Sequence, residues 1–400
     1  MFATLQPTAG DPLLALMNAF KADSRTDKID LGVGVYKDEN GHTPILPSVK
    51  TAEAYLLDTQ STKAYIGPAG APSLGKAMEQ LLFPQAYADS QQLLASGRVI
   101  TAQATGGTGA LRVGADFIHR TQPQAKIWVS SPTWANHHNI FDSAGLEVRD
   151  YPYYDAADQS LDFAGMLATL QEVPAGDVVL LHACCHNPTG LDLTAEQWHQ
   201  VGVVLQERGA MPFIDSAYLG FAEGLDEDAQ GINVLAGYCP EMLIASSCSK
   251  NFGLYNERIG ALTVVAATAR DAQAAFSQIC YCIRGNYSMP PNHGAGIVST
   301  IIDSPELKSQ WEQELTEMRS RILEMRLLFT QTLAKSGAQQ DFSFIAAQRG
   351  MFSFSGLNPE QVKRLQSDDA IYIVGSGRIN VAGMTHDNLD RLCQAIIRVL

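Results

Sequence analysis

Short apolar runs recur through the middle of the chain and constrain its fold more than any other feature. They begin near residue 98, and several are apolar throughout instead of alternating with polar residues. Continuous apolar runs are typical of strands that are covered on both faces. The expected strands are Arg98–Ala102, Lys126–Ser130, Asp177–Ala183, Met211–Ile214, Met242–Ala245 and Ala261–Val265.

Helical segments separate some of these runs. The clearest is Thr194–Arg208, where Thr194 and Gln197 have the spacing of a capping box and Gly209 provides a C-terminal stop. Asp11 and Pro12 indicate another helix start near the N-terminus. Strands that alternate with helices predict an α/β domain with a mostly parallel sheet.

The pattern changes after about residue 305. Apolar residues then recur at spacings of three and four, which predicts one long amphipathic helix that ends near Gly337. Short strands and a final helix, Asn388–Leu400, are expected beyond it. We therefore predict a second, smaller α+β domain. The apolar positions of the long helix are Trp311, Leu315, Met318, Ile322, Met325, Phe329 and Leu333.

Composition excludes several classes of partner. The chain has 28 basic and 42 acidic residues, a net charge of −14, whereas nucleic-acid and anionic-membrane surfaces need clustered Lys and Arg. No apolar run approaches the ~18 residues that a membrane span needs, and the first twenty residues lack the features of a signal peptide. The seven cysteines have neither a disulfide pattern nor metal-finger spacing. We expect a cytoplasmic protein without a structural metal.

Lys250 is the most informative single residue. It follows an apolar run and lies among small hydroxyl residues in the stretch Ser246–Gly253. One interpretation is a strand-end lysine that reaches solvent. The other is a lysine whose neutral amine forms a Schiff base with a carbonyl group. The second requires surroundings that lower the pKa of the amine, because a free lysine titrates near ~10.4.

A glycine-rich stretch, Ala104–Leu111, follows one expected strand and opens a helix. Backbone N–H groups at a helix N-terminus bind phosphate, although a plain tight turn would have the same composition. The stretch fits a dinucleotide site poorly, since Arg112 stands where the third glycine belongs and no acidic residue lies between Asp116 and Asp142. The pattern favours one phosphate over a nicotinamide dinucleotide.

Two other polar segments follow apolar runs. Asp215 ends one run, where a carboxylate can cap the next helix or pair with a protonated ring nitrogen. His186–Gly190 follows another run and is either a simple turn or part of a ligand site.

Four segments together resemble the class I aminotransferases, and within them the aspartate and aromatic amino-acid branch. The segments are Ser247–Arg258, His186–Gly190, Asp215–Tyr218 and Gly377–Met384. The likeness runs from Asp11 to the C-terminus, with a slightly longer segment near Gln85–Gly97. It implies the pyridoxal-phosphate-dependent aminotransferase fold type I, with a mostly parallel seven-stranded sheet flanked by helices. The implied domains are a large domain at 46–305, a small α+β domain at 306–400, and an N-terminal segment at 1–45 that packs with the small domain.

The resemblance implies pyridoxal 5′-phosphate as the cofactor, held by Lys250 as an internal aldimine. The freed Lys250 amine would then move the proton during transamination. Asp215 would keep the ring nitrogen protonated, and Asn187 and Tyr218 would hydrogen-bond the phenolic oxygen. Trp134 would stack on the ring.

The same resemblance assigns supporting roles to other positions. His137 would support Asp215, and Pro132 and Pro188 would follow cis peptide bonds. The expected phosphate-binding residues are Gly107, Thr108, Ser247, Ser249 and Arg258.

Substrate contacts also follow from the resemblance. Arg378 would bind the α-carboxylate and Arg284 the distal carboxylate of a dicarboxylic substrate. Arg284 and Tyr65 would reach into the neighbouring subunit's site, which implies a homodimer with shared sites. Gly34 and Tyr36 would belong to a segment that closes over the substrate. The expected substrate-binding residues are Gly34, Trp134, Asn187, Arg284 and Arg378.

Two departures from the family bear on specificity. Ala64 and Met289 stand where aspartate-preferring members commonly carry asparagine. Apolar replacements would favour a bulkier, apolar side chain, while Arg284 keeps dicarboxylates acceptable. We expect transamination of aromatic amino acids and aspartate, with 2-oxoglutarate as amino acceptor.

The sequence is also compatible with other functions. One is an aspartate-preferring aminotransferase with little aromatic activity. A second is a pyridoxal-phosphate lyase or decarboxylase on the same fold. A nicotinamide oxidoreductase fits the glycine-rich stretch poorly, and a ligand-sensing regulator would need a DNA-binding segment or loss of Lys250.

Overall fold

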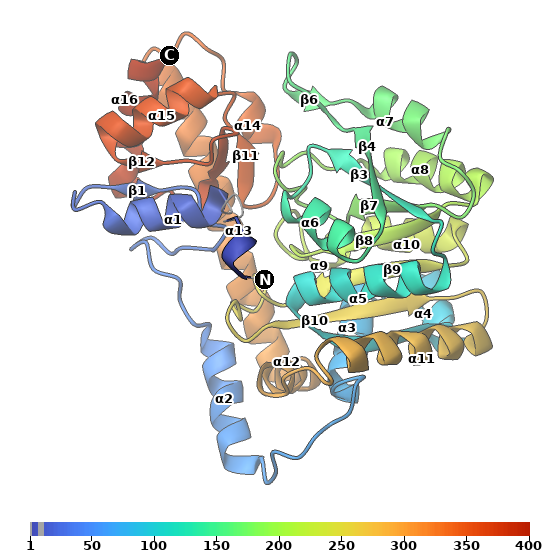
Figure 1. Ribbon diagram of the computed structural model, residues 1–400. Helices are drawn as coiled ribbons and strands as arrows, with labels where there is room; N and C mark the ends of the chain where they lie inside the picture. Colours follow the sequence, from blue (N-terminus) through green and yellow to red (C-terminus); the bar gives the residue numbers. More distant parts are fainter. Residues whose placement is uncertain (1, 7–11) are drawn as a thin grey trace.

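A sheet of seven strands forms the centre of the larger part of the molecule (Figure 1). The computed structural model describes residues 2–6 and 12–400, so Asp11 lies outside the described residues. β10 runs antiparallel to both of its neighbours, and every other adjacent pair is parallel. The predicted α/β class with a mostly parallel seven-stranded sheet is confirmed. In spatial order the strands are β2 (Val99–Thr105), β10 (Ile259–Val265), β9 (Met242–Ser247), β8 (Met211–Ser216), β7 (Val178–His182), β3 (Lys126–Ser131) and β4 (Glu147–Pro152).

The central strands are buried on both faces, as their apolar runs predict. In β7, Val178 and Leu180 face one apolar cluster, while Val179 and Leu181 face another. This alternation follows from the two-residue period of a strand. The first cluster is covered by α5 (Gly106–Thr121), α6 (Asn136–Ser143) and α11 (Ala269–Asn286), and the second by α4 (Ala88–Ala95), α7 (Phe163–Leu170), α8 (Ala195–Arg208) and α10 (Gln230–Tyr238).

β4 has no counterpart among the six strands expected from the apolar runs. This strand lies at the edge of the sheet, and its residues Glu147, Arg149 and Asp150 are exposed. A charged edge strand has no apolar run by which it can be recognised. The six predicted strands are present with ends shifted by up to three residues.

The predicted capping box of α8 is confirmed. The side chain of Thr194 accepts from the N–H of Gln197, the side chain of Gln197 accepts from the N–H of Thr194, and Gly209 is left-handed at φ 64°. The other helices of this region are α2 (Pro47–Thr59), α3 (Pro72–Leu82), α9 (Leu225–Asp228) and α12 (His293–Asp303).

The long helix α13, Pro305–Lys335, begins six residues before the first predicted apolar position, because Ser304 caps its N-terminus and Pro305 occupies its first turn. All seven predicted apolar positions on α13 are buried. The final helix, α16 (His386–Val399), likewise begins two residues before its predicted start, at a capping box formed by Thr385 and Asn388. The remaining elements are α14 (Phe344–Ala347), α15 (Pro359–Asp369), β5 (Tyr154–Asp155), β6 (Ser160–Leu161), β11 (Phe352–Phe354), β12 (Ile371–Tyr372) and β13 (Arg378–Asn380).

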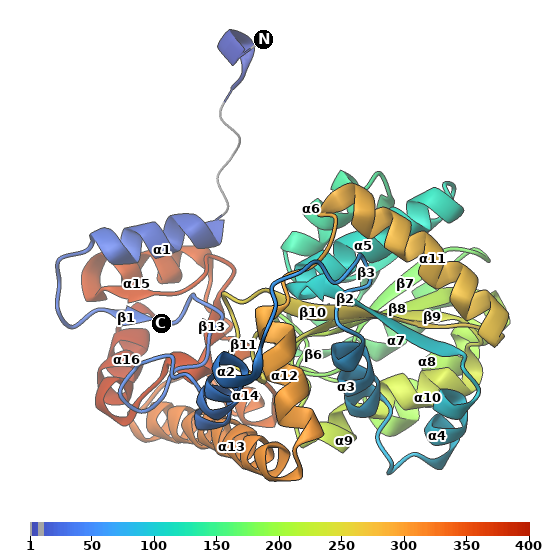
Figure 2. The same cartoon turned by 90° about the horizontal axis from the view of Figure 1, so that it is seen from below.

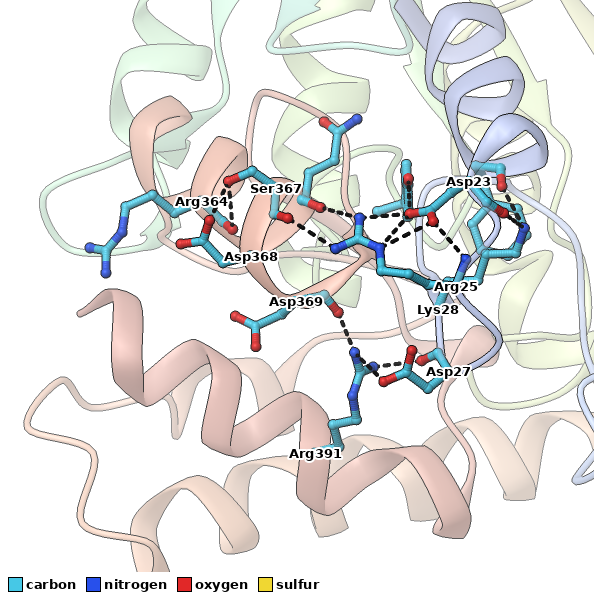
Figure 3. Close-up of polar contacts among 12 residues, drawn as sticks. Asp23, Arg25, Asp27, Lys28, Arg364, Ser367, Asp368, Asp369 and Arg391 are labelled. Atoms are coloured by element: carbon cyan, nitrogen blue, oxygen red, sulfur yellow. Dashed lines mark hydrogen bonds and ion pairs between the residues drawn. The ribbon is translucent and has the colours of Figure 1, made fainter.

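Residues 12–30 lie against the C-terminal elements (Figures 1 and 2). They contain α1 (Pro12–Ala22) and β1 (Ile29–Asp30), and β1 pairs in parallel with β12. Arg25 donates to the carbonyls of Gln366 and Ser367 at 3.0 and 2.9 Å, and Arg391 forms an ion pair with Asp27 at 3.1 Å (Figure 3). The division into 1–45, 46–305 and 306–400 stays a prediction, which these contacts support.

Among the residues that the structure describes, no helix combines the length and apolar character needed to cross a membrane.

Candidate active site

A cavity of about 270 Å³ lies at the carboxyl ends of the central strands. Parallel strands bring their carboxyl ends to one edge of a sheet, where open α/β sheets bind ligands. β8 contributes Asp215, β9 ends at Ser247, and the segment after β7 contributes Asn187. Twelve of the fourteen predicted site residues line this cavity: Gly34, Gly107, Thr108, Trp134, Asn187, Asp215, Tyr218, Ser247, Ser249, Lys250, Arg258 and Arg378.

Lys250 faces the cavity instead of reaching solvent freely. Its Nζ lies 4.6 Å from the centre of the Tyr218 ring. Burial lowers the pKa of Lys250 to about 8, Asp215 opposes this shift, and the positive charge of Arg258 adds to it. A substantial fraction of the amine is therefore neutral near neutral pH, as nucleophilic attack requires.

Asp215 is buried and paired with a histidine. His137 Nε2 lies 3.1 Å from an Asp215 carboxylate oxygen, and His137 Nδ1 lies 2.7 Å from the hydroxyl oxygen of Thr133. Burial by itself would raise the pKa of Asp215, but the hydrogen bond and charge of His137 hold that pKa below its ordinary value. The carboxylate is thus kept ionised inside the protein.

A glycine turn and an arginine form an anion-binding corner of the cavity. Gly106 opens α5 at φ +74°, and a Cβ placed on it would lie 2.5 Å from a guanidinium nitrogen of Arg258. A Cβ on Gly107 would lie 3.1 Å from Ser247 Cβ. Residues larger than glycine would fill this corner, where the N-terminus of a sixteen-residue helix meets a cation.

Arg378 also lines the cavity. Its guanidinium donates to the carbonyl of Gly32 at 2.7 Å and to the side-chain oxygen of Asn187 at 3.4 Å. It also lies 4.3 Å from the centre of the Phe352 ring. The buried Nε of Arg378 has no hydrogen-bond partner among the described residues. A buried guanidinium with a free donor is suited to binding a carboxylate.

The segment containing Gly34 covers part of the cavity. A Cβ on Gly34 would lie 2.9 Å from Phe352, and the backbone N–H of Tyr36 donates to the hydroxyl oxygen of Tyr255 at 2.9 Å. Glycine at position 34 therefore allows this segment to pack closely on the aromatic wall.

Two predicted site residues lie outside the cavity of the single chain. Tyr65 is 93% exposed. Arg284 is also exposed, and its guanidinium donates a hydrogen bond to the hydroxyl oxygen of Ser288. The specificity positions Ala64 and Met289 do not line the cavity either; Ala64 is exposed and Met289 is partly buried.

Several residues that line the cavity were not predicted from the sequence, including His182, Tyr255 and Phe352. His182 ends β7 beside Asp215, and burial lowers the pKa of His182 to about 3, so this ring is neutral. The position of His182 within the apolar run 177–183 is the sequence feature that could have identified it as a site residue. The peptide bonds before Pro132 and Pro188 are cis, as predicted.

Comparison with known proteins gives the family of this chain. Residues 26–396 match the family described as "Aminotransferase class I and II". The chain is 54% identical to an aspartate aminotransferase of Salmonella typhi over all of both chains. It is 48% identical to an aromatic-amino-acid aminotransferase of Pseudomonas aeruginosa, over all of this chain and 98% of the relative.

A solved structure of an aromatic-amino-acid aminotransferase from Burkholderia pseudomallei, covalently bound to pyridoxal phosphate, has the same fold. It is 45% identical, with a TM-score of 0.97, over all of this chain and 99% of that one. The fold and the cavity define an enzyme of the α/β class whose cavity is lined by a buried lysine and by a glycine turn that meets an arginine. The chain belongs to the class I and II aminotransferases.

Proposed function

We propose that this enzyme transfers the amino group of aspartate or of an aromatic amino acid to 2-oxoglutarate, using pyridoxal 5′-phosphate. Relatives named for each of the two donor types match the whole chain at 54% and 48% identity. The observation that carries the proposal is the placement of Lys250, Asp215 and Arg378 around one cavity.

The residues of the cavity fit this cofactor. The corner formed by Gly106, Gly107 and Arg258 would hold the phosphate, together with the hydroxyls of Thr108, Ser247 and Ser249. Asp215 would hold a proton on the ring nitrogen, and Trp134 would cover the ring. When bound, pyridoxal phosphate supplies an electrophilic carbon and a ring that delocalises the electron pair left at the substrate Cα.

The chain's own side chains would divide the remaining work. Arg378 binds the substrate α-carboxylate and so fixes the orientation of the Cα–H bond. Lys250, in its neutral form, would accept the Cα proton and would return it to the electrophilic carbon that the cofactor supplies. Asn187 and Tyr218 donate hydrogen bonds toward the cofactor's phenolic oxygen. The segment with Gly34 and Tyr36 excludes water when substrate is bound.

We further propose a cytoplasmic homodimer in which Arg284 and Tyr65 complete the neighbouring subunit's site. Support comes from the exposure of large apolar side chains on one segment: Leu57 is 88%, Tyr55 55% and Tyr65 93% exposed. Such a patch is typical of a covered interface. All seven cysteines are free, which suits a reducing compartment.

The visible absorption spectrum of the purified protein tests the function directly. We expect a band from the lysine-bound cofactor that both aspartate and phenylalanine convert to the amino form when no oxo acid is present. If only aspartate converts it, the enzyme is an aspartate aminotransferase and our interpretation of Ala64 and Met289 is wrong. If no band forms after pyridoxal phosphate is added, the proposal fails.

A further inference from the structure

The loop between β7 and α8 carries Asn187 into the cavity, and its backbone is unusual. Cys185 adopts a left-handed conformation at φ 52°, which residues other than glycine rarely do. The turn then closes tightly, since the N–H of Gly190 donates to the carbonyl of His186 at 2.7 Å. Something must hold Cys185 in this conformation for Asn187 to face the ligand.

The carboxylate of Asp192 makes that contact. One oxygen accepts from the N–H of Cys185 at 2.7 Å, and the other accepts from the N–H of His186 at 2.9 Å. Two successive N–H groups that converge on one carboxylate form an anion-binding turn. Asp192 thus closes the loop from its C-terminal end and fixes the two residues directly before Asn187.

The opposite side of the loop is fixed by a different contact. The carbonyl of Gly190 accepts from the N–H of Arg349 at 2.7 Å, and a Cβ on Gly190 would lie 2.6 Å from the carbonyl oxygen of Phe352. This contact holds the end of the loop that follows Asn187. At the end that precedes Asn187, Asp192 holds the backbone of Cys185 and His186, while the His186 side chain contacts the hydroxyls of Ser130 and Thr189, each at 2.9 Å.

The charge on Asp192 is unfavourable for stability. Burial raises the pKa of Asp192 to about 6, and the N–H groups of His186 and Cys185 offset this only in part; Asp228 raises it further and Arg349 lowers it. A carboxyl group with a raised pKa binds its proton more tightly in the folded chain, so its ionisation at neutral pH reduces stability. In either protonation state the Asp192 oxygens lie within hydrogen-bond distance of the two N–H groups, so the geometry of the turn carries the argument.

We propose that Asp192 is a positioning residue for Asn187, which holds the left-handed turn at Cys185 so that the Asn187 amide points at the cofactor. This inference rests on the proposed function, in which Asn187 hydrogen-bonds the phenolic oxygen of the cofactor. Asp192 itself does not line the cavity.

A double-mutant cycle tests the proposal. The variants are Asp192→Ala, Asn187→Ala and the combination, with Asp192→Asn as a milder change that keeps one acceptor oxygen. Asp155→Ala is the matched control, because Asp155 also accepts from two successive N–H groups, those of Ala157 and Asp158 at 2.8 and 3.3 Å, but lies outside the cavity.

Three quantities are measured for each variant. They are kcat with aspartate, the pH midpoint of the visible absorption change of the bound cofactor, and amide hydrogen exchange of residues 183–192. We expect Asp192→Ala to lower kcat about tenfold, which is less than the ~100-fold that a misplacement of about 1 Å can cost, because the contacts of Gly190 with Arg349 remain. It should shift the pH midpoint in the same direction as Asn187→Ala and speed exchange in the loop. Asp192→Asn should give a smaller effect of the same kind, and Asp155→Ala none.

The effect of Asp192→Ala in the Asn187→Ala background shows whether Asp192 acts through Asn187. If Asp192 acts through Asn187, Asp192→Ala changes kcat less than twofold when Asn187 is already alanine. Equal losses in both backgrounds would overturn the positioning role, as would unchanged exchange at Cys185 and His186. If Asn187→Ala itself leaves the midpoint unchanged, the role of Asn187 in the proposed function is wrong as well, and that result is separate from the exchange data.

Discussion

The lowered pKa of Lys250 makes a quantitative prediction about how fast the cofactor-free protein captures pyridoxal phosphate. Burial brings the pKa of Lys250 to about 8, compared with 10.5 for an unperturbed lysine. At pH 7 the neutral fraction is then about 9%, whereas an unperturbed lysine would be about 0.03% neutral. The burial of Lys250 should therefore raise its reactivity at pH 7 about 300-fold through the neutral fraction alone.

Rapid-mixing absorbance measurements between pH 6 and pH 10 would show this directly. We expect the capture rate to rise tenfold per pH unit below about 8 and to level off above it. Pyridoxal without its phosphate is the control, because it docks without the Arg258 corner but reacts with the same amine. Both compounds should give the same midpoint. A rate that rises with unit slope through pH 10 would show that the cavity does not perturb Lys250.

The same shift has a consequence for stability whose sign is fixed. The folded chain binds the Lys250 proton less tightly than the unfolded chain, so the cofactor-free protein should gain stability as pH rises from about 8 to about 10.5. The difference between a pKa of 10.5 and one of about 8 corresponds to at most about 3.4 kcal/mol. Urea unfolding of a Lys250→Met variant, which lacks this group, should show no such gain; an equal gain in both proteins would assign it to other residues.

Two further predictions concern the carboxylate contacts. Arg378→Lys should raise KM for aspartate and for phenylalanine by a similar factor, about 100-fold, because an ammonium group cannot make the two-pronged contact with the α-carboxylate. If KM rises only for aspartate, Arg378 binds the distal carboxylate instead. Unfolded Lys250→Ala and Arg284→Ala chains, mixed and refolded together, should restore about one quarter of wild-type activity with aspartate. Half of the dimers would be hybrids, and each hybrid would have one complete site out of two. If the mixture is no more active than the parent variants, Arg284 does not act across subunits.

The fold was predictable to the extent that burial leaves a mark on the sequence. The central strands are covered on both faces, so their apolar runs located β2, β3 and β7–β10 to within a few residues. The edge strand β4 is partly exposed and charged, and nothing in its composition distinguishes it from a loop. The start of the final helix was displaced by two residues, because its capping residue, Thr385, lies before the predicted first residue, Asn388.

The site was predictable where residues next to a strand end carry an unusual side chain. Lys250, Asp215 and Asn187 each follow an apolar run, and the resemblance supplied roles for them. Phe352 could not be placed in this way, because it meets Arg378 and Gly34 only through packing of segments that are far apart in the sequence. Asp192 lies in a turn, and its value depends on two backbone N–H groups whose directions the sequence does not show.

Burial acts in opposite directions on the pKa values of Lys250 and Asp215, which line the same cavity, and the partners of each group decide the outcome. A direct ion pair would stabilise the charged forms of both Lys250 and Asp215, and the amine would then be a poor nucleophile. No such ion pair occurs among the residues that the structure describes. Asp215 instead contacts His137 at 3.1 Å, and the Lys250 amine lies over the Tyr218 ring at 4.6 Å. The Asp215 carboxylate therefore stays charged, while Lys250 loses its proton more readily than an ordinary lysine. These are the properties required of a carboxylate that pairs with a protonated ring nitrogen and of an amine that carries a proton.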